Sequence, residues 1–178
     1  MQTPRLDREK KVAEIVRDAG GSIVGRTKFQ KVAYLLELAG FGNGFRFEYR
    51  HYGPYSEDLT SAISTARVFG LIREEEKKAN WGGIYSVYTY KESDDLSDDL
   101  ADSSRKNFAQ AACQIDSILL ELAATAAYLY AVEGSQDPWG ETAQRKPTKA
   151  KDGRLELAKN AYRNLLDLST PKPLPKIA

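Results

Sequence analysis

Apolar residues recur at intervals of three and four positions over the first forty residues, which predicts two amphipathic helices. The first helix spans residues 6–19, and the second begins near Thr27 and ends at Gly40. Gln30 follows Thr27 at the spacing of a capping box, in which each side chain bonds the backbone amide of the other residue. The positions that we expect to face the core are Val12, Ile15, Val16 and Ala19 in the first helix and Phe29, Val32, Ala33 and Leu36 in the second.

The pattern changes to a strict alternation in Phe45–Tyr49, which predicts a short strand with one solvent-facing side. Gly53-Pro54 is a turn signal. Ser56 is a good N-cap for a third helix that ends at Phe69, because its hydroxyl can accept a bond from a free amide of the first turn. Two acidic residues follow Ser56, where the helix dipole favours them.

Two further segments, 71–77 and 84–90, predict a β-hairpin with its loop near Trp81. Helices followed by a hairpin are the plan of a winged helix. The long segment 40–55 departs from that plan, since a compact helix-turn-helix has a turn of about three or four residues there.

The second half of the chain predicts more helices. Residues 91–104 form an acidic connector, and 106–132 carry the strongest helical periodicity of the chain. We expect a loop from Pro138 to Gly153 and a last amphipathic helix over 155–168.

The fold class predicted from these elements is α+β and mostly helical. We expect a winged-helix-like core of helices and a β-hairpin wing over residues 6–92 and additional C-terminal helices over 93–168. The two parts form a single domain over 1–168, and the proline-rich residues 169–178 form a flexible tail.

Composition adds few constraints. The chain has 178 residues with 42% hydrophobic and 29% charged residues, as expected for a soluble globular protein. The polar start shows no signal region, and the apolar run 118–132 contains Glu121 and is too short to span a bilayer, so we expect a cytoplasmic protein without a membrane partner. Cys113 is the single cysteine, which excludes an intrachain disulfide and a cysteine metal cluster.

The net charge of +1 is uninformative, but its distribution is uneven. Basic residues predominate in 1–50 and 142–178, and acidic residues predominate in 91–104. Basic ends around an acidic middle are compatible with polyanion contact, with self-association or simply with solvated helix faces.

Catalytic constellations are sparse. His51 is the single histidine and therefore the one histidine available as a general base; a pairing with Ser56 is conceivable, but Ser56 is better explained as an N-cap. Cys113 lies on or near an apolar helix face, which favours packing over nucleophilic chemistry. The carboxylates of 94–99 are spaced around a solvated surface instead of one metal cage. We therefore expect no enzyme activity, no bound metal and no cofactor.

Recognition is the better explanation of the polar and aromatic residues around the Gly-Pro pair. A helix start attracts anions, and tyrosines supply contact area at low entropy cost. The alternative is a packed corner, with Tyr52 under the turn, Tyr55 against the second helix and His51 bonded to a carbonyl. Basic side chains at the start of the second helix also remain for solvent or a partner. The residues that we expect to bind a partner are Arg26, Lys28, Gln30, Lys31, His51, Tyr52, Gly53, Pro54, Tyr55 and Ser56.

Several of these motifs are similar to those of a known family. The stretches GRTKFQKVAYLLELAGFG and FEYRHYGPYSEDLTSAISTARVFGLI resemble the YwgA-like family of small prokaryotic proteins, which is similar to the Panacea, or SocA-like antitoxin, domain. The shared features are the Lys28, Gln30 and Lys31 helix start and the Tyr-Gly-Pro turn. In the second half, LLELAATAAYLY looks like the family's Leu-Glu-x-x-Ala-Thr helix, and Lys146-Pro147 falls where a Lys-Pro precedes its last helix.

The resemblance implies a winged-helix-like core with added helices. In the Panacea group it implies neutralisation of an associated toxin, in toxin–antitoxin or phage-related gene neighbourhoods. The function expected from the resemblance is therefore that of a non-enzymatic regulatory protein that binds a protein partner, a toxin or a phage-defence effector. The residues Tyr55-Ser56 after Gly-Pro are closer to the YwgA-like pattern than to the Panacea pattern.

The alternative is a winged-helix DNA-binding transcriptional regulator. Such a protein places a helix in the major groove and contacts phosphates through basic residues. The third helix offers Arg67 alone, and the hairpin offers Lys77 and Lys78. A homodimer through the long helix 106–132 is a further expectation that the pattern allows.

Overall fold

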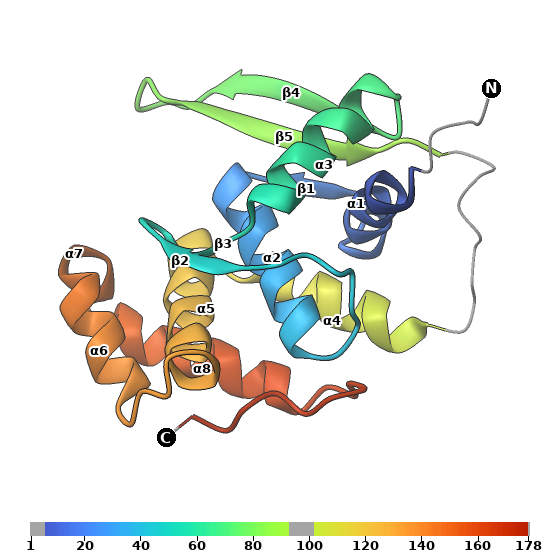
Figure 1. Cartoon of the computed structure of the whole chain (residues 1–178). Helices are drawn as coiled ribbons and strands as arrows, with labels where there is room; N and C mark the ends of the chain where they lie inside the picture. The colour runs from blue at the N-terminus through green and yellow to red at the C-terminus, as the bar shows by residue number, and fades with distance from the viewer. Residues whose placement is uncertain (1–5, 93–101, 178) are drawn as a thin grey trace.

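The computed structural model describes residues 6–92 and 102–177 of the chain, and the fold is α+β and mostly helical. A small antiparallel sheet lies at one side, helices from the first half of the chain pack beneath it, and the C-terminal helices form the opposite side (Figure 1). The elements of the first half are α1 (Asp7–Asp18), β1 (Ser22–Val24), α2 (Arg26–Leu38), β2 (Glu48–Arg50), β3 (Gly53–Tyr55), α3 (Glu57–Val68), β4 (Ile72–Lys78) and β5 (Ile84–Tyr90).

The three-stranded sheet has the order β1-β5-β4, with all neighbours antiparallel. The expected hairpin is confirmed as β4 and β5, and the three helices precede it in the predicted order. Strand β1 was not predicted: Ile23 is its one buried residue, and it pairs with Tyr88 of β5. A three-residue strand is too short for a periodic pattern to reveal.

The N-cap of α3 is confirmed, because the Ser56 hydroxyl accepts from the amide of Leu59 at 3.1 Å. The capping box at the start of α2 is wrong. Gly25, with φ of 97°, precedes the helix there, and its first turn receives no side-chain cap within the described part of the chain. The Gln30 side chain instead reaches across to α3, as described below.

The corner between α2 and α3 differs from its prediction. The strand expected over Phe45–Tyr49 is displaced to Glu48–Arg50, and it pairs with Gly53–Tyr55 as a two-stranded ribbon. Gly53-Pro54 therefore belongs to a strand, and the turn itself consists of His51 and Tyr52. Glycine and proline are common in turns, but proline is also tolerated in an edge strand.

The helices of the second half are α4 (Ser103–Gln114), α5 (Ser117–Ala131), α6 (Pro138–Arg145), α7 (Pro147–Ala150) and α8 (Arg154–Leu166). The single helix expected over 106–132 is therefore wrong: the chain bends by 118° between α4 and α5. The break falls at Ile115, whose backbone is extended, and Asp116 caps α5 by accepting from the amide of Ile118 at 2.9 Å. The residues 138–153, expected as a loop, contain two short helices that each begin with proline, a favoured first helical residue.

Helix α5 lies at the centre of the second half and packs against α2, α6 and α8 (Figure 1). Nearly all its side chains from Leu120 to Leu129 are buried inside the chain, including Glu121 and Thr125. The periodicity of this stretch thus reflects burial within the fold. A homodimer through it stays a prediction, since the structure contains one chain.

The C-terminal segment, expected to be a flexible tail, lies against the body of the protein up to residue 177 (Figure 1). The Lys172 amide donates to the Ala39 carbonyl at 3.0 Å, and the Tyr162 hydroxyl donates to the Pro175 carbonyl at 2.6 Å. Leu174 is buried. Most of the acidic connector expected over 91–104, including the carboxylates of 94–99, lies outside the described residues.

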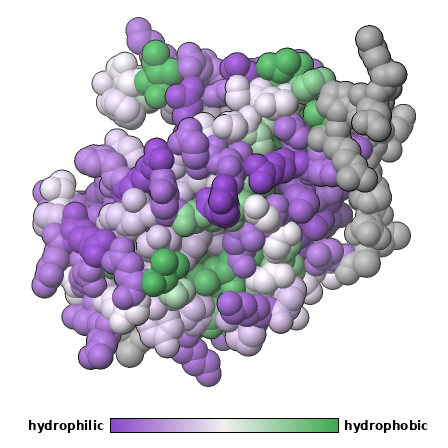
Figure 2. All heavy atoms as spheres, viewed as in Figure 1, coloured by the Kyte–Doolittle hydropathy of each residue, from purple (hydrophilic) through white to green (hydrophobic). Residues whose placement is uncertain are grey.

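Within residues 6–92 and 102–177, no single helix has the length and apolar composition needed to cross a membrane. The bent pair α4 and α5 meets those criteria only when the two helices are taken together. Figure 2 shows that the visible face is largely hydrophilic, with small and separate hydrophobic areas.

Candidate functional site

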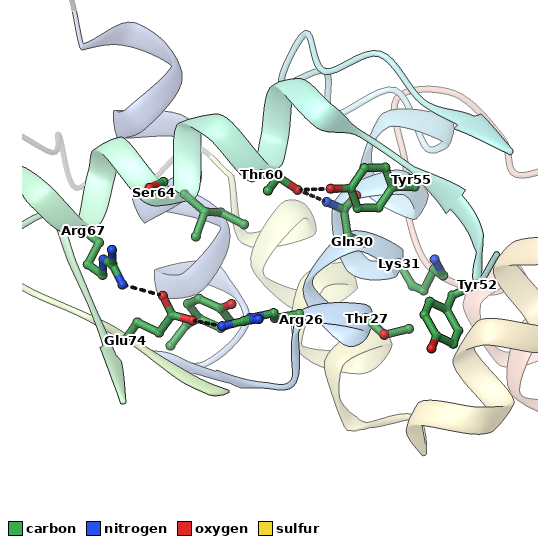
Figure 3. Close-up of a pocket in the computed structure, with 12 residues that line it drawn as sticks. Arg26, Thr27, Gln30, Lys31, Tyr52, Tyr55, Thr60, Ser64, Arg67 and Glu74 are labelled. Carbon is green, nitrogen blue, oxygen red and sulfur yellow. Dashed lines mark hydrogen bonds and ion pairs between the residues drawn. The ribbon is translucent and has the colours of Figure 1, made fainter. Parts of the chain in front are cut away.

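Gln30 fixes the start of α3 against α2. Its side-chain oxygen accepts from the Ser56 amide at 2.8 Å, and its nitrogen donates to the Ser56 carbonyl at 3.0 Å and to the Thr60 hydroxyl at 3.0 Å. Thr60 in turn donates to the Tyr55 hydroxyl at 2.8 Å, so a chain of hydrogen bonds joins α2, α3 and β3 (Figure 3). Gln30 is buried, and it therefore positions this corner rather than facing solvent.

Lys31 is the second buried polar side chain of α2. We expected it to face solvent or a partner, but it is 1% exposed, and its Nζ donates to the Pro54 carbonyl at 2.7 Å. Burial lowers the pKa of Lys31 to about 7. The negative charge of Glu121 opposes this shift, and the positive charges of Lys146 and Lys149 add to it. The amine is therefore close to half-protonated at neutral pH.

The remaining basic residues at this helix start are divided between the interior and the surface. Lys28 is half-buried and donates to the Cys113 carbonyl at 2.9 Å. Arg26 keeps 68% of its side chain exposed. Arg26 is thus the basic residue of α2 that meets the expectation of solvent exposure, although it pairs with Glu74 and Glu76.

Gly53 allows the ribbon to approach α5. Its φ is +88°, and a Cβ at this position would lie 2.4 Å from the Thr125 hydroxyl. Both the conformation and the lack of space require glycine here. The Thr125 hydroxyl is buried without a hydrogen-bond partner among the described residues, directly under this close approach.

A charged cluster below the turn joins the corner to the C-terminal helices. Glu121 is buried in α5, where its carboxylate accepts from Lys146 at 2.7 Å and from Lys149 at 2.8 and 2.9 Å. Lys146 also donates to the His51 carbonyl at 3.3 Å. Residue-by-residue reasoning did not assign these three residues to the site. Glu121, a charged residue inside the apolar run 118–132, was the signal that could have revealed this cluster, because a buried carboxylate needs a charged or hydrogen-bonding partner.

The turn itself presents two rings to solvent. His51 is exposed, and its ring lies edge-on to that of Tyr52 with centroids 4.9 Å apart. Tyr52 is 52% exposed, so it does not lie under the turn, and the Lys149 ammonium sits 4.7 Å from its ring centroid. Tyr55 is half-buried, and the Arg50 guanidinium stacks over it at 4.9 Å.

A cavity of about 580 Å³ lies between α2, α3, the hairpin and this turn (Figure 3). That volume is typical of a ligand pocket. Five of the ten residues predicted to bind a partner line the cavity, and Arg67 of the alternative set also lines it. The predicted residues outside the lining are Lys28, His51, Gly53, Pro54 and Ser56, and Lys77 and Lys78 of the alternative set. The lining residues are Arg26, Thr27, Gln30, Lys31, Tyr52, Tyr55, Thr60, Ile63, Ser64, Arg67, Glu74 and Tyr88.

Glu74 organises the end of the cavity next to the hairpin. Arg26 from α2 and Arg67 from α3 both point to its carboxylate, each at 3.3 Å, and the Ser86 hydroxyl donates to it at 2.8 Å (Figure 3). Burial would raise the pKa of Glu74, but the hydrogen bonds from Ser86, Tyr88 and Arg26 hold it below its usual value. Glu74 is therefore a carboxylate at neutral pH.

The residues of the DNA-binding alternative are less favourably placed. Arg67 is paired with Glu74, and the start of α3 is acidic, with Asp58 contacting Arg46 at 3.3 Å. Lys77 and Lys78 are exposed on β4 near the hairpin tip, where Trp81 is 82% exposed.

The geometry offers few groups for catalysis. Ser56 is fully buried and its hydroxyl caps α3, whereas His51 lies at the surface against Tyr52. Cys113 is half-buried, and burial raises the pKa of its thiol, opposed by nearby Lys28. Within residues 6–92 and 102–177, no group of three or more His, Cys, Asp or Glu side chains could hold a metal ion.

No family model matches the chain. It is similar to the uncharacterized protein YwgA of Bacillus subtilis strain 168, with 29% identity over 135 residues, which cover 74% of this chain and 80% of that protein. This similarity supports the resemblance of the chain to YwgA-like proteins.

Proposed function

We propose that the protein is a non-enzymatic regulatory protein of the cytoplasm that binds a protein partner through the cavity and the exposed turn beside it. The observation that carries the proposal is the convergence of Arg26, Tyr52 and Tyr55, from three separate elements, around one cavity of about 580 Å³. These are residue types that dominate the energy of protein interfaces. The proposed binding surface consists of the cavity lining together with His51.

The support beneath this surface favours binding over catalysis. Gln30, Lys31 and Gly53 are buried, and they fix the backbone of the turn through hydrogen bonds and close packing. A rigid backbone lowers the entropy lost when a partner binds. The side chains that reach solvent, His51 and Tyr52, are held in a defined arrangement by this support.

The resemblance to the YwgA-like family, which is similar to the Panacea domain, gives the proposal its biological direction. The residues that carry this resemblance include Lys31, Tyr52-Gly53-Pro54, Glu121 and Lys146, which meet at the corner described above. We therefore propose that the partner is a toxin or a phage-defence effector, which the protein binds and neutralises.

A winged-helix DNA-binding regulator is the second candidate. The order of the helices and hairpin and the sheet order β1-β5-β4 favour it. However, α3 opens with two acidic residues, and Arg67 is its one basic residue, already paired with Glu74. An affinity for duplex DNA that falls steeply with salt concentration would support this candidate.

The test of protein binding is a tagged pull-down from the native host followed by mass spectrometry. Wild type is compared with a His51→Ala/Tyr52→Ala double variant and with Arg163→Gln, a control on α8 away from the cavity. We expect one or more proteins to be lost with the double variant alone. An unchanged set of captured proteins, with the double variant folded by circular dichroism, would refute the proposed surface.

A further inference from the structure

The surroundings of the cavity carry more positive than negative charge. Its lining includes Arg26, Lys31 and Arg67 against the single carboxylate of Glu74. Tyr52 lines the other end of the cavity, and the ammonium of Lys149 lies over its ring. Lys149 and Lys146 both donate to the carboxylate of Glu121. Glu76 is outside this lining; it is 62% exposed and pairs with Arg26. The lining itself therefore carries two arginines and the partly protonated Lys31 against one carboxylate, and a partner with negative charge would balance this excess.

The two arginines have donors left for such a partner. Each guanidinium carries five N–H groups. Arg26 uses one nitrogen for Glu74 and Glu76, and Arg67 uses one for Glu74, all at 3.3 Å, which is long for a charge-assisted hydrogen bond. Arg26 also hydrogen-bonds Tyr88, which leaves it fewer free donors than Arg67. Their side chains are 68% and 52% exposed. The Glu74 side chain is only 10% exposed and needs these partners, so a new carboxylate would share the exposed sides of the two guanidiniums instead of displacing Glu74.

Besides polar side chains such as Thr60 and Ser64, the cavity lining has an apolar wall, formed by Ile63 and Tyr88. These two residues, from α3 and β5, line the same cavity as the two arginines and the tyrosines of the corner. Both are buried. A carboxylate next to a large apolar side chain therefore matches the charged end and the apolar wall at the same time.

We propose that the partner enters this cavity through a segment that pairs an Asp or Glu with a neighbouring large apolar residue. The acid binds between Arg26 and Arg67, and the apolar side chain packs on Ile63 and Tyr88. Glu74 holds the two guanidiniums in place and competes with the incoming acid for them. This inference rests on the proposed function, since it names the chemistry that the same surface recognises.

The experiment is a selection from a random library of displayed twelve-residue peptides on the immobilised full chain. Selected peptides are synthesised, and their affinities are measured by fluorescence anisotropy for wild type, for a Tyr52→Ala/Tyr55→Ala double variant and for the three variants described below. We expect an Asp or Glu beside Phe, Leu, Ile, Met or Trp in the selected peptides. The double variant Arg26→Gln/Arg67→Gln should bind them at least about tenfold more weakly, since charged hydrogen bonds are lost.

Glu74→Gln should bind the same peptides more tightly, because the competing carboxylate is gone. A purely structural role of Glu74 predicts the opposite, a loss of affinity. Arg163→Gln on α8 is the matched control and should leave affinity unchanged. Selected peptides without acidic residues, affinities unchanged in the double arginine variant, or no selected peptide at all would each overturn the inference.

The results separate this inference from the proposed function. Peptides that depend on Tyr52 and Tyr55 but contain no acid would leave the binding surface in place and refute its acidic partner alone. Peptides that bind independently of Tyr52, Tyr55 and both arginines would count against the surface as a whole.

Discussion

Replacing Lys31 by methionine tests the electrostatics of the corner. Its ammonium is buried beneath the ribbon, with the Pro54 carbonyl at 2.7 Å, and burial lowers its pKa from 10.5 to about 7. The unfolded chain keeps the ordinary pKa, so it binds more protons than the folded chain between pH 7 and 10.5. The stability of the wild type therefore rises with pH across this window. The destabilisation caused by burying the lysine, called the penalty below, is fully present below pH 7.

The magnitude follows from the two pKa values. A proton bound by the unfolded chain alone changes the free energy of unfolding by about 1.4 kcal/mol for each pH unit. Because the folded amine is half-protonated at pH 7, the penalty falls from about 4 kcal/mol at pH 7 to about 2 kcal/mol at pH 9. Lys31→Met removes this titration. It also removes the hydrogen bond to Pro54, a loss of about 1 kcal/mol that does not depend on pH.

The assay is urea unfolding of both proteins at pH 7 and pH 9, followed by circular dichroism. Between the two pH values, the wild type should gain about 2 kcal/mol relative to Lys31→Met. Lys78→Met, the same change at an exposed position of β4, is the control for replacing a lysine. A stability difference between wild type and Lys31→Met that is equal at both pH values would refute the reasoning, because it would mean that Lys31 keeps its ordinary pKa in the fold.

Three further changes test the packing of the corner and the tail. Gly53→Ala should destabilise the fold by about 3 kcal/mol in urea unfolding, from a strained φ and the clash with Thr125, and Thr125→Ala in the same chain should recover part of this loss. Glu121→Gln should lower the free energy of unfolding by about 3–5 kcal/mol, because it leaves Lys146 buried without its carboxylate; no loss would show that Lys146 is not charged there. Deleting residues 169–178 should lower the free energy of unfolding by about 2–4 kcal/mol and lower Tm, because one buried leucine and two hydrogen bonds are lost. An unchanged Tm would mean that the tail is loose in solution.

Periodicity predicted the elements whose signal is long and local. Helices α1, α2, α3 and α8 and the β4–β5 hairpin lie where their patterns placed them, to within a few residues. The helix predicted over 106–132 failed because α4 and α5 carry apolar residues on both sides of Asp116, and the chain direction changes there without a break in hydrophobicity. Asp116, a residue type that favours the N-cap of a helix, was the local signal for a new helix start.

The site was predicted in part: the sequence pointed to several of its residues but did not show which of them are buried and which are exposed. Gln30 and Lys31 were expected near the surface with Arg26, yet both turn inward and support the ribbon. Helical spacing alone does not reveal this, because a polar residue next to an apolar stripe can face solvent or bond a buried carbonyl. The partners of Lys31 lie on a different segment, so its burial depends on tertiary packing that the local pattern does not contain.

The dependence of the turn on α5 and Lys146 has a consequence for how the protein is made. The ribbon that carries His51 and Tyr52 closes on Thr125 and Lys146, which are synthesised much later. The N-terminal helices and hairpin can begin to fold during translation, but the turn lacks its support until the C-terminal helices have left the ribosome. A nascent or prematurely terminated chain would therefore present Tyr52 without its fixed geometry, so that the proposed binding surface is complete only when the C-terminal helices have been made.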